Sequence, residues 1–213
     1  MEKKKFCIVG TSGFGRETLT CLIDVMSNTA LKIEDAVVFL DEDGSCEEST
    51  LMGIPVIKKN EFVPQSFKVV VAIGDPKTRK KVVEALPPET EFTSIVHPSA
   101  VISQWVEVGQ GSIITAGAVL TCNINIGKHA HINLHTTIGH DCTIGDYFTT
   151  APATNISGNC EFGDYVYLGT NSSVRQGIKI CNDVTIGMGG IVVKNIDEEG
   201  VYIGNPVSKL GRK

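Results

Sequence analysis

The sequence is poor in aromatic residues, in positive charge and in long apolar segments. Aromatic side chains make up 6% of the 213 residues, and there is a single tryptophan. The chain has 19 Lys and Arg against 24 Asp and Glu, a formal net charge of −5, which argues against a surface that binds nucleic acid. No apolar stretch approaches the roughly 18 residues that span a bilayer, so we expect no membrane insertion.

The cysteines also lack the spacings that indicate a metal site or a redox pair. There are seven of them, with no CxxC arrangement. The opening segment MEKKKFCIVGTSGFGRE interrupts its short apolar run with glycines and charges, which is not typical of a signal peptide. We therefore expect a cytoplasmic protein with reduced, buried thiols. Hydrophobic residues make up 42% of the chain, enough for a packed core.

The two halves of the chain differ in composition. Of the 22 glycines, 16 lie from residue 96 onward, and residues 96–193 carry only nine charged side chains in 98 positions. In the first half, apolar runs that predict strands alternate with apolar spacings that predict helices. The predicted strands are Lys5–Val9, Ala36–Leu40 and Val69–Ile73, and the predicted helices are Arg16–Met26 and Pro76–Leu86. This alternation predicts a small, Rossmann-like α/β domain with a parallel sheet over residues 1–94, followed by a second domain over residues 95–213.

A six-residue period runs through the second half without interruption. Of the seventeen positions spaced by six from Val96 to Val192, fifteen are Ile, Leu or Val, and the exceptions are Thr150 and Phe162. The residue after the aliphatic is often glycine, and the fourth residue after it is often small. Such hexapeptide repeats are typical of a left-handed parallel β-helix, in which three hexads form one 18-residue coil of a triangular prism.

Three motifs, together with the hexapeptide array, give the chain a family resemblance. They are GTSGFGRE at residues 10–17, AIGD at residues 72–75 and IGHDCTIG at residues 138–145. The chain resembles the sialic-acid-O-acetyltransferase-like group of hexapeptide acyltransferases. That group includes the N-acetyltransferases of nucleotide-linked 4-amino-4,6-dideoxy sugars, which serve bacterial surface glycans such as the O-antigen of lipopolysaccharide. The resemblance implies an enzyme that transfers an acetyl group from acetyl-CoA to the sugar amine directly.

This reaction needs a base for the amine proton and a hydrogen-bond donor for the thioester oxyanion. Histidine is a base near neutral pH, and a carboxylate beside it orients the ring. By the family resemblance, the base is His140 and the acid that follows it is Asp141. His140 lies two positions after an inward aliphatic, so we expect it at a corner of the prism. Gly158, one coil later, leaves room for the thioester to approach its backbone N–H.

The resemblance also implies contacts to acetyl-CoA from the upper coils, at Thr149, Gly158, Thr170 and Met188. Some family members carry a histidine where this chain has Thr149. His131 lies 18 residues before Thr149, so the two side chains should stack on one face. Three histidines lie close enough in sequence to suggest a metal cluster: His129, His131 and His135. Acyl transfer requires no metal and the family uses none, so we expect none.

In the family, the N-terminal domain holds the nucleotide of the sugar substrate. Glycines after a first strand let phosphates approach the N-terminus of the following helix. The family match assigns the pocket to Gly13, Phe14, Gly15, Asp41, Glu42 and Gly74. Phe14 stands where some relatives have a histidine. For residues 41–43 the alternative is a solvated turn.

Other functions remain open from the sequence. One alternative is a sugar O-acetyltransferase of the sialic acid type, and another is a non-catalytic β-helix used for assembly. Neither the nucleotide (dTDP, UDP or GDP) nor the sugar configuration is specified. The weakly polar faces of the prism and the family resemblance predict a homotrimer with active sites between neighbouring subunits.

Overall fold

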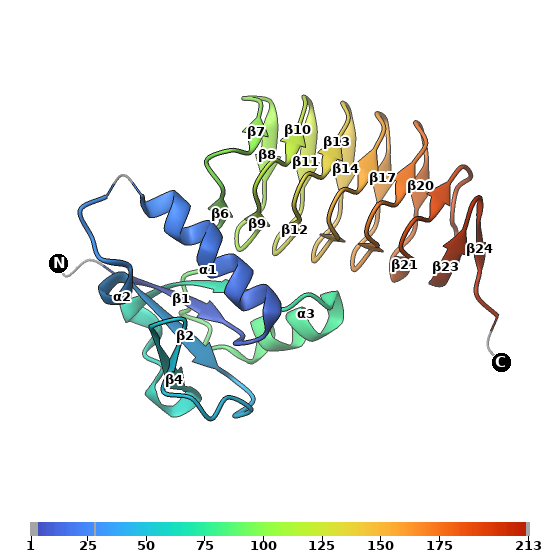
Figure 1. Ribbon diagram of the computed structural model, residues 1–213. Helices are drawn as coiled ribbons and strands as arrows, with labels where there is room; N and C mark the ends of the chain where they lie inside the picture. The colour runs from blue at the N-terminus through green and yellow to red at the C-terminus, as the bar shows by residue number, and fades with distance from the viewer. Residues whose placement is uncertain (1–3, 28, 212–213) are drawn as a thin grey trace.

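The computed structural model describes residues 4–27 and 29–211, which form an α/β domain followed by a triangular β-helix (Figure 1). No helix in this described part of the chain is long and apolar enough to cross a membrane. The α/β domain contains, in chain order, β1 (Lys5–Val9), α1 (Gly13–Met26), α2 (Ile33–Ala36), β2 (Val37–Asp41), β3 (Thr50–Leu51), β4 (Ile54–Lys58), β5 (Phe67–Val71) and α3 (Pro76–Ala85). Two short 3-10 turns, Lys59–Glu61 and Pro64–Ser66, connect β4 to β5.

The sheet of this domain has the order β3-β4-β2-β1-β5, and all its pairings are parallel except that of β3 with β4. Helix α1 packs its buried Leu19 and Leu22 on one side of the sheet, and α3 packs on the other. Because the main strands are parallel, the loops after β1, β2 and β5 meet at one edge, the usual ligand edge of an α/β sheet. Sequence patterns missed β4, whose Pro55 is a residue that disfavours a strand.

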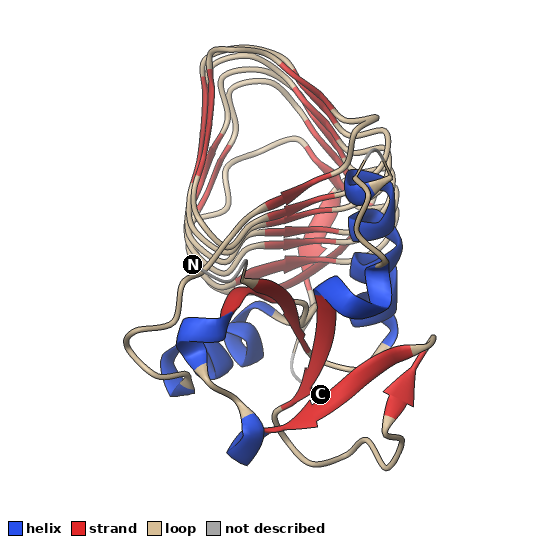
Figure 2. Cartoon of the chain, turned by 90° about the vertical axis from the view of Figure 1, so that its left-hand side faces the viewer, coloured by secondary structure: helices blue, strands red, loops and turns tan. Residues whose placement is uncertain are grey.

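The β-helix has three flat faces, each a parallel sheet of short strands (Figure 2). The docking face, which lies against the α/β domain, contains β6 (Ile95–Val96), β9 (Ile113–Ile114), β12 (His131–Ile132), β15 (Thr149–Thr150), β18 (Tyr167–Leu168), β21 (Val184–Ile186) and β23 (Gly200–Gly204), with β24 (Val207–Lys209) antiparallel at its end. The second face contains β7 (Val101–Ile102), β10 (Val119–Leu120), β13 (Thr137–Ile138), β16 (Asn155–Ile156), β19 (Ser173–Val174) and β22 (Ile191–Val192). The third face contains β8 (Val106–Val108), β11 (Ile124–Ile126), β14 (Cys142–Ile144), β17 (Glu161–Phe162) and β20 (Lys179–Ile180).

The strand register confirms the predicted repeat. Strands of neighbouring coils pair residues that are 18 apart, such as His131 with Thr149. The inward aliphatics of the hexads are buried from Ile114 onward. Val96 is 39% exposed because it closes the first, open end of the prism, where no coil lies beneath it. Cys142 and Cys160 are free thiols, and both are buried inside the prism.

A ladder of side-chain oxygens runs along the edge between the third face and the docking face. Asp146 Oδ1 accepts from the Lys128 N–H at 2.7 Å, and Asp164 Oδ1 accepts from the Asp146 N–H at 2.8 Å. Asn182 Oδ1 accepts from the Asp164 N–H at 2.9 Å. Each coil therefore ties the backbone of the coil before it at the same corner.

Candidate active site

His140 and Asp141 lie on the edge that joins the second and third faces, and their side chains are 51% and 47% exposed. Asp141 has a φ of 59°, a left-handed conformation that Asp and Asn tolerate well. Its Oδ2 is 2.7 Å from His140 Nδ1, so the carboxylate holds the proton on Nδ1 and leaves Nε2 as an acceptor. His140 is therefore at an exposed corner, with the nitrogen that a base needs directed away from Asp141.

Asn123 completes this group, although the sequence motifs did not indicate it. It lies 18 residues before Asp141 in the same column of left-handed turns, and its Nδ2 donates to Asp141 Oδ1 at 3.1 Å. The hydrogen bonds from His140 and Asn123 lower the pKa of Asp141 below its usual value. The carboxylate is thus ionised over the pH range in which histidine acts as a base.

Gly158 lies directly against the His140 ring. A Cβ atom at this position would lie 2.7 Å from both Cε1 and Nε2 of the imidazole. The His140 ring therefore fills the space beside the Gly158 Cα, and a side chain at Gly158 would displace the ring. The Gly158 N–H itself donates to no other group within the described residues.

The other predicted acetyl-CoA contacts lie elsewhere on the prism. Thr170 and Met188 are on the edge between the docking face and the second face, and Met188 is 82% exposed. Thr149 is on the docking face and only 4% exposed. One subunit therefore brings Gly158 to His140 but does not bring Thr149, Thr170 or Met188 there.

Thr149 instead belongs to a buried polar contact between the two domains. Arg79, on α3, is fully buried, and its Nη2 donates to Thr149 Oγ1 at 2.8 Å. Its Nη1 is 2.8 Å from His131 Nδ1, while His131 Nε2 lies 3.0 Å from the Val71 carbonyl oxygen. Because the guanidinium only donates and the carbonyl only accepts, His131 is neutral with its proton on Nε2.

Burial and the nearby charge of Arg79 hold the pKa of His131 well below its usual value. The same two causes lower the pKa of His129 to about 4. His129 is 3% exposed and stacks on Tyr147, with ring centroids 5.3 Å apart. Both histidines are thus part of the packing between domains rather than of an exposed cluster.

This arrangement predicts a loss of stability at acidic pH. Between pH 6.5 and 4 the unfolded chain binds a proton at His129 and the folded chain does not, so His129 alone lowers the free energy of unfolding by about 1.4 kcal/mol per unit of falling pH. The lowered pKa of His131 adds a change of the same sign. His129→Phe, which keeps the stacked ring, should reduce this slope in urea unfolding at pH 7, 6 and 5. His135→Phe, at an exposed left-handed turn, is the matched control and should keep the wild-type slope. Equal slopes in His129→Phe and wild type would contradict the assignment.

The predicted nucleotide residues gather at the carboxyl edge of the α/β sheet. Gly13 begins α1, and a Cβ there would meet no atom within 4 Å. Ser12, the residue before the helix, makes no side-chain cap, so the first N–H groups of α1 have no capping oxygen. Gly74, after β5, is also open, whereas a Cβ on Gly15 would lie 2.1 Å from the Gly10 carbonyl oxygen. Gly15 is therefore required by packing of the loop itself.

Phe14 does not point freely into this edge. Its ring lies against that of His131 on the docking face, with centroids 4.6 Å apart. Phe14 is half-buried, so it contributes at most one face to a ligand. The contact connects the first glycine loop to the β-helix.

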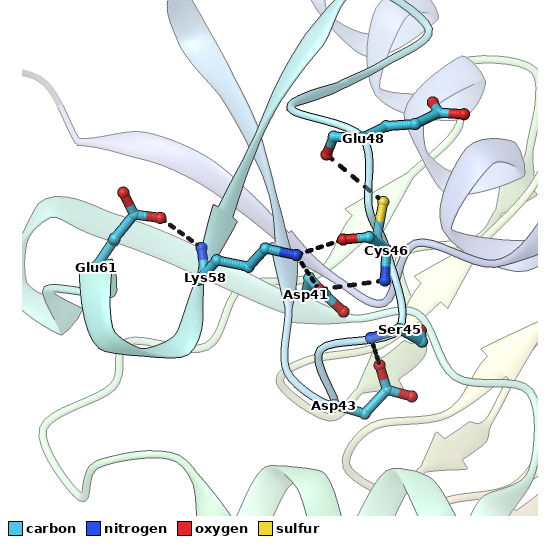
Figure 3. Close-up of polar contacts among 7 residues, drawn as sticks. All are labelled: Asp41, Asp43, Ser45, Cys46, Glu48, Lys58 and Glu61. Carbon is cyan, nitrogen blue, oxygen red and sulfur yellow. Dashed lines mark hydrogen bonds and ion pairs between the residues drawn. The ribbon is translucent and has the colours of Figure 1, made fainter.

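Asp41 is neither a solvated turn nor a free carboxylate. It is 2% exposed and its Oδ2 is 2.6 Å from Lys58 Nζ, as Figure 3 shows. Lys58 Nζ also donates to the Cys46 carbonyl, and the Cys46 N–H donates to Asp41 Oδ2 at 3.3 Å. These bonds fix the loop after β2, while Asp41 Oδ1 has no partner within the described residues.

Glu42, the next residue, lines a cavity of about 280 Å³. Burial is the largest cause that raises the pKa of Glu42 above its usual value. Lys59 and Lys81 also line this cavity, together with the apolar Leu40 and Val82. A lining that mixes apolar and charged side chains suits a planar polar ligand.

No group of three or more His, Cys, Asp or Glu side chains that could hold a metal ion occurs in residues 4–27 and 29–211. His129 and His135 lie at opposite edges of the docking face. His131 is buried against Arg79, and His135 is exposed at a turn on a different edge from His140.

Comparison with protein families gives two matches along the chain. The profile of the PglD N-terminal domain matches residues 5–86, which include the glycine loop, Asp41 and Gly74. The profile described as hexapeptide repeat of succinyl-transferase matches residues 163–194 in the upper coils. The first match lies in the α/β domain and the second in the β-helix.

Individual relatives extend the similarity over the whole chain. The structure of WeeI from Acinetobacter baumannii is 30% identical, with a TM-score of 0.89 over 98% of this chain and 100% of that one. PerB from Caulobacter crescentus, solved with CoA and GDP-perosamine, is 27% identical, with a TM-score of 0.86 over 99% of each chain. The UDP-N-acetylbacillosamine N-acetyltransferase of Bacillus subtilis is 29% identical over 114 residues, 53% of this chain. That match spans about half of the Bacillus protein, 52% of its length.

Proposed function

The chain belongs to the hexapeptide acyltransferases that include the nucleotide-sugar N-acetyltransferases, and from this premise we propose that it acetylates the amino group of a nucleotide-linked 4-amino-4,6-dideoxy sugar with acetyl-CoA. The observation that carries the proposal is the His140–Asp141 pair, which is half-exposed and has the Gly158 N–H beside it. The sugar product would enter a bacterial surface glycan such as the O-antigen.

In this proposal His140 is the general base. Its Nε2 accepts the proton of the sugar amine as the amine nitrogen bonds to the thioester carbonyl carbon. Asp141, held by Asn123, stabilises the imidazolium that forms. The Gly158 N–H donates to the oxyanion. When the C–S bond breaks, His140 returns the proton to the leaving thiolate of CoA, so no covalent acyl-enzyme is needed.

In this proposal the carboxyl edge of the α/β sheet binds the nucleotide part of the substrate. The uncapped first turn of α1, with the open Gly13, offers backbone N–H groups and the positive end of the helix dipole to a diphosphate. The cavity beside Glu42 lies at the end of β2, at this edge of the sheet, and we assign it to the base. Phe14, Gly15, Asp41 and Gly74 shape the loops around it.

The assay of CoA release tests the function. The purified protein is given acetyl-CoA with UDP-, GDP- and dTDP-linked 4-amino sugars, and in parallel with sialic acid as a hydroxyl acceptor. We expect release with one of the amino sugars and an N-acetyl product by mass spectrometry. Release that depends on the hydroxyl acceptor would favour the O-acetyltransferase, and no release with any acceptor would favour a non-catalytic β-helix.

We further propose a homotrimer whose sites lie between subunits, because Thr170 and Met188 lie on a different edge of the prism from His140. In a trimer one edge of each prism meets a different edge of its neighbour, so acetyl-CoA can contact Gly158 of one subunit and Thr170 and Met188 of the next. Exposed apolar side chains outside the α/β domain, such as Val101 at 62%, fit a covered surface.

Mixed trimers test this arrangement. His140→Ala and Met188→Trp each damage a different half of the proposed site. Refolded together in equal amounts, the two inactive proteins should recover up to about one quarter of wild-type activity, because about one interface in four then carries both intact halves. Inactive mixed trimers, with their composition verified by native mass spectrometry, would show that each site is built within one subunit.

A further inference from the structure

Arg79 makes an unusual set of contacts for a buried charge. Its Nη1 donates to the carbonyl oxygens of Ile73 at 2.7 Å and Gly74 at 3.2 Å, in the loop after β5. Its Nη2 donates to the carbonyl oxygens of Tyr147 at 2.7 Å and Phe148 at 3.3 Å, in the β-helix. One guanidinium therefore holds a loop of the α/β domain and a coil of the prism together.

Arg79 has no carboxylate partner within the described residues. Burial lowers its pKa to about 9, so it remains a cation at neutral pH. An unpaired buried cation is costly, and an apolar side chain would fill the same space at lower cost. The rigid planar fork of donors supplies directional contacts that an apolar side chain cannot. These contacts indicate that Arg79 fixes the positions of the backbone groups to which it donates.

Thr149 contacts the same loop after β5. Its Oγ1 accepts from Arg79 and donates to the Gly74 carbonyl at 3.4 Å. The loop between β1 and α1 contacts the same place, because the Phe14 ring lies against that of His131, which accepts from Arg79. Both loops that shape the proposed nucleotide site are thus held against the same part of the docking face.

We propose that Arg79 and Thr149 are positioning residues that hold the loop after β5 in the conformation that binds the nucleotide diphosphate. They touch neither the reacting amine nor the thioester. They act through the Gly74 backbone, whose open side faces the ligand edge. This inference rests on the proposed function and gives Thr149 a role towards the nucleotide in place of the acetyl-CoA contact that the sequence suggested.

Thr149→Val is the decisive variant, because it keeps the shape and the β-branched side chain while removing both hydrogen bonds. We measure the affinity for UDP, GDP, dTDP and CoA by titration calorimetry. We expect the nucleotide diphosphate that wild type binds to bind about 5- to 20-fold more weakly, as for the loss of a hydrogen bond to a charged group. The affinity for CoA should change less than 2-fold. A selective loss of CoA affinity, or unchanged affinity for all four, would overturn the inference.

Thr185→Val is the matched control. Thr185 lies in the same outward column of the docking face, two coils further along, and is half-buried with no side-chain hydrogen bond to a described residue. It should leave all four affinities unchanged. An equal loss in Thr185→Val would indicate a general effect on the face and overturn the specific role of Thr149. Arg79→Lys keeps the charge without the fork and should weaken nucleotide binding more than Thr149→Val does.

The calorimetry separates this inference from the proposed function. Wild-type protein that binds CoA but none of the three nucleotide diphosphates would overturn both. Wild-type protein that binds one of them with the same affinity as Thr149→Val would overturn the positioning role alone. Thermal unfolding of each variant accompanies the titrations and establishes that each affinity is measured on folded protein.

Discussion

Replacement of His140 by alanine is expected to lower kcat by about 10²–10⁴, the usual range for the loss of a general base. The side chain is half-exposed, and its hydrogen bonds within the described residues are confined to Asp141, so the fold should not depend on it. The measurement is kcat with the best acceptor of the CoA-release panel, together with the midpoint of thermal unfolding. An unchanged midpoint with near-normal turnover would remove His140 from the role of base.

His140→Asn distinguishes proton acceptance at residue 140 from its hydrogen bond to Asp141. Asparagine can still hydrogen-bond to Asp141 but cannot accept a proton at neutral pH. It should therefore be as inactive as the alanine variant, with a KM for both substrates close to that of wild type. A partly active His140→Asn variant would mean that the ring positions the amine rather than deprotonating it.

Gly158→Ala should be nearly as damaging as loss of the histidine itself, by about 10²–10³ in kcat, because a methyl group would occupy the space of the imidazole. The added Cβ would lie 2.7 Å from two ring atoms, so the ring must rotate away from the position that Asp141 gives it. A displacement of this size in a catalytic group is typically costly.

A double-mutant cycle identifies the cause. In the His140→Ala background there is no ring to displace, so adding Gly158→Ala should lower the residual kcat by less than 2-fold. If Gly158→Ala costs the same factor in both backgrounds, its effect lies in the oxyanion donor or in crowding of the thioester. That result would contradict displacement of the histidine ring.

The β-helix could be predicted from sequence because its signal is periodic and local. Each hexad repeats the same demand for an inward aliphatic, and the predicted strand phase is that observed from Ile114 to Val192. Asn123 was available to the same reasoning, because it lies 18 residues before Asp141 and coils stack residues at that spacing. The α/β domain was less readable, since strands as short as β3 and one with a proline carry little pattern.

The contacts between domains could not be predicted in this way. Arg79 reaches residues 52 to 70 positions away, and nothing in the residues around it indicates that its side chain enters the β-helix. Likewise, Asp41 after a strand reads as a ligand contact, whereas Lys58, 17 positions later, neutralises it. Such pairings depend on how two independently patterned units meet, which local periodicity does not encode.

The ladder of Asp146, Asp164 and Asn182 repeats the same hydrogen bond between successive coils. Every rung joins a side-chain oxygen to the backbone one coil earlier, so this hydrogen bond has the same form in successive coils. An insertion or deletion of 18 residues would preserve every rung, whereas one of 17 would turn each following side chain off its column. In evolution the prism can therefore change length only in whole coils, moving whatever lies beyond the change by steps of about 4.8 Å. The α/β domain contacts coils from Ile95 to Asp183, so the distance from its nucleotide edge to a site beyond those coils changes only in steps of one coil.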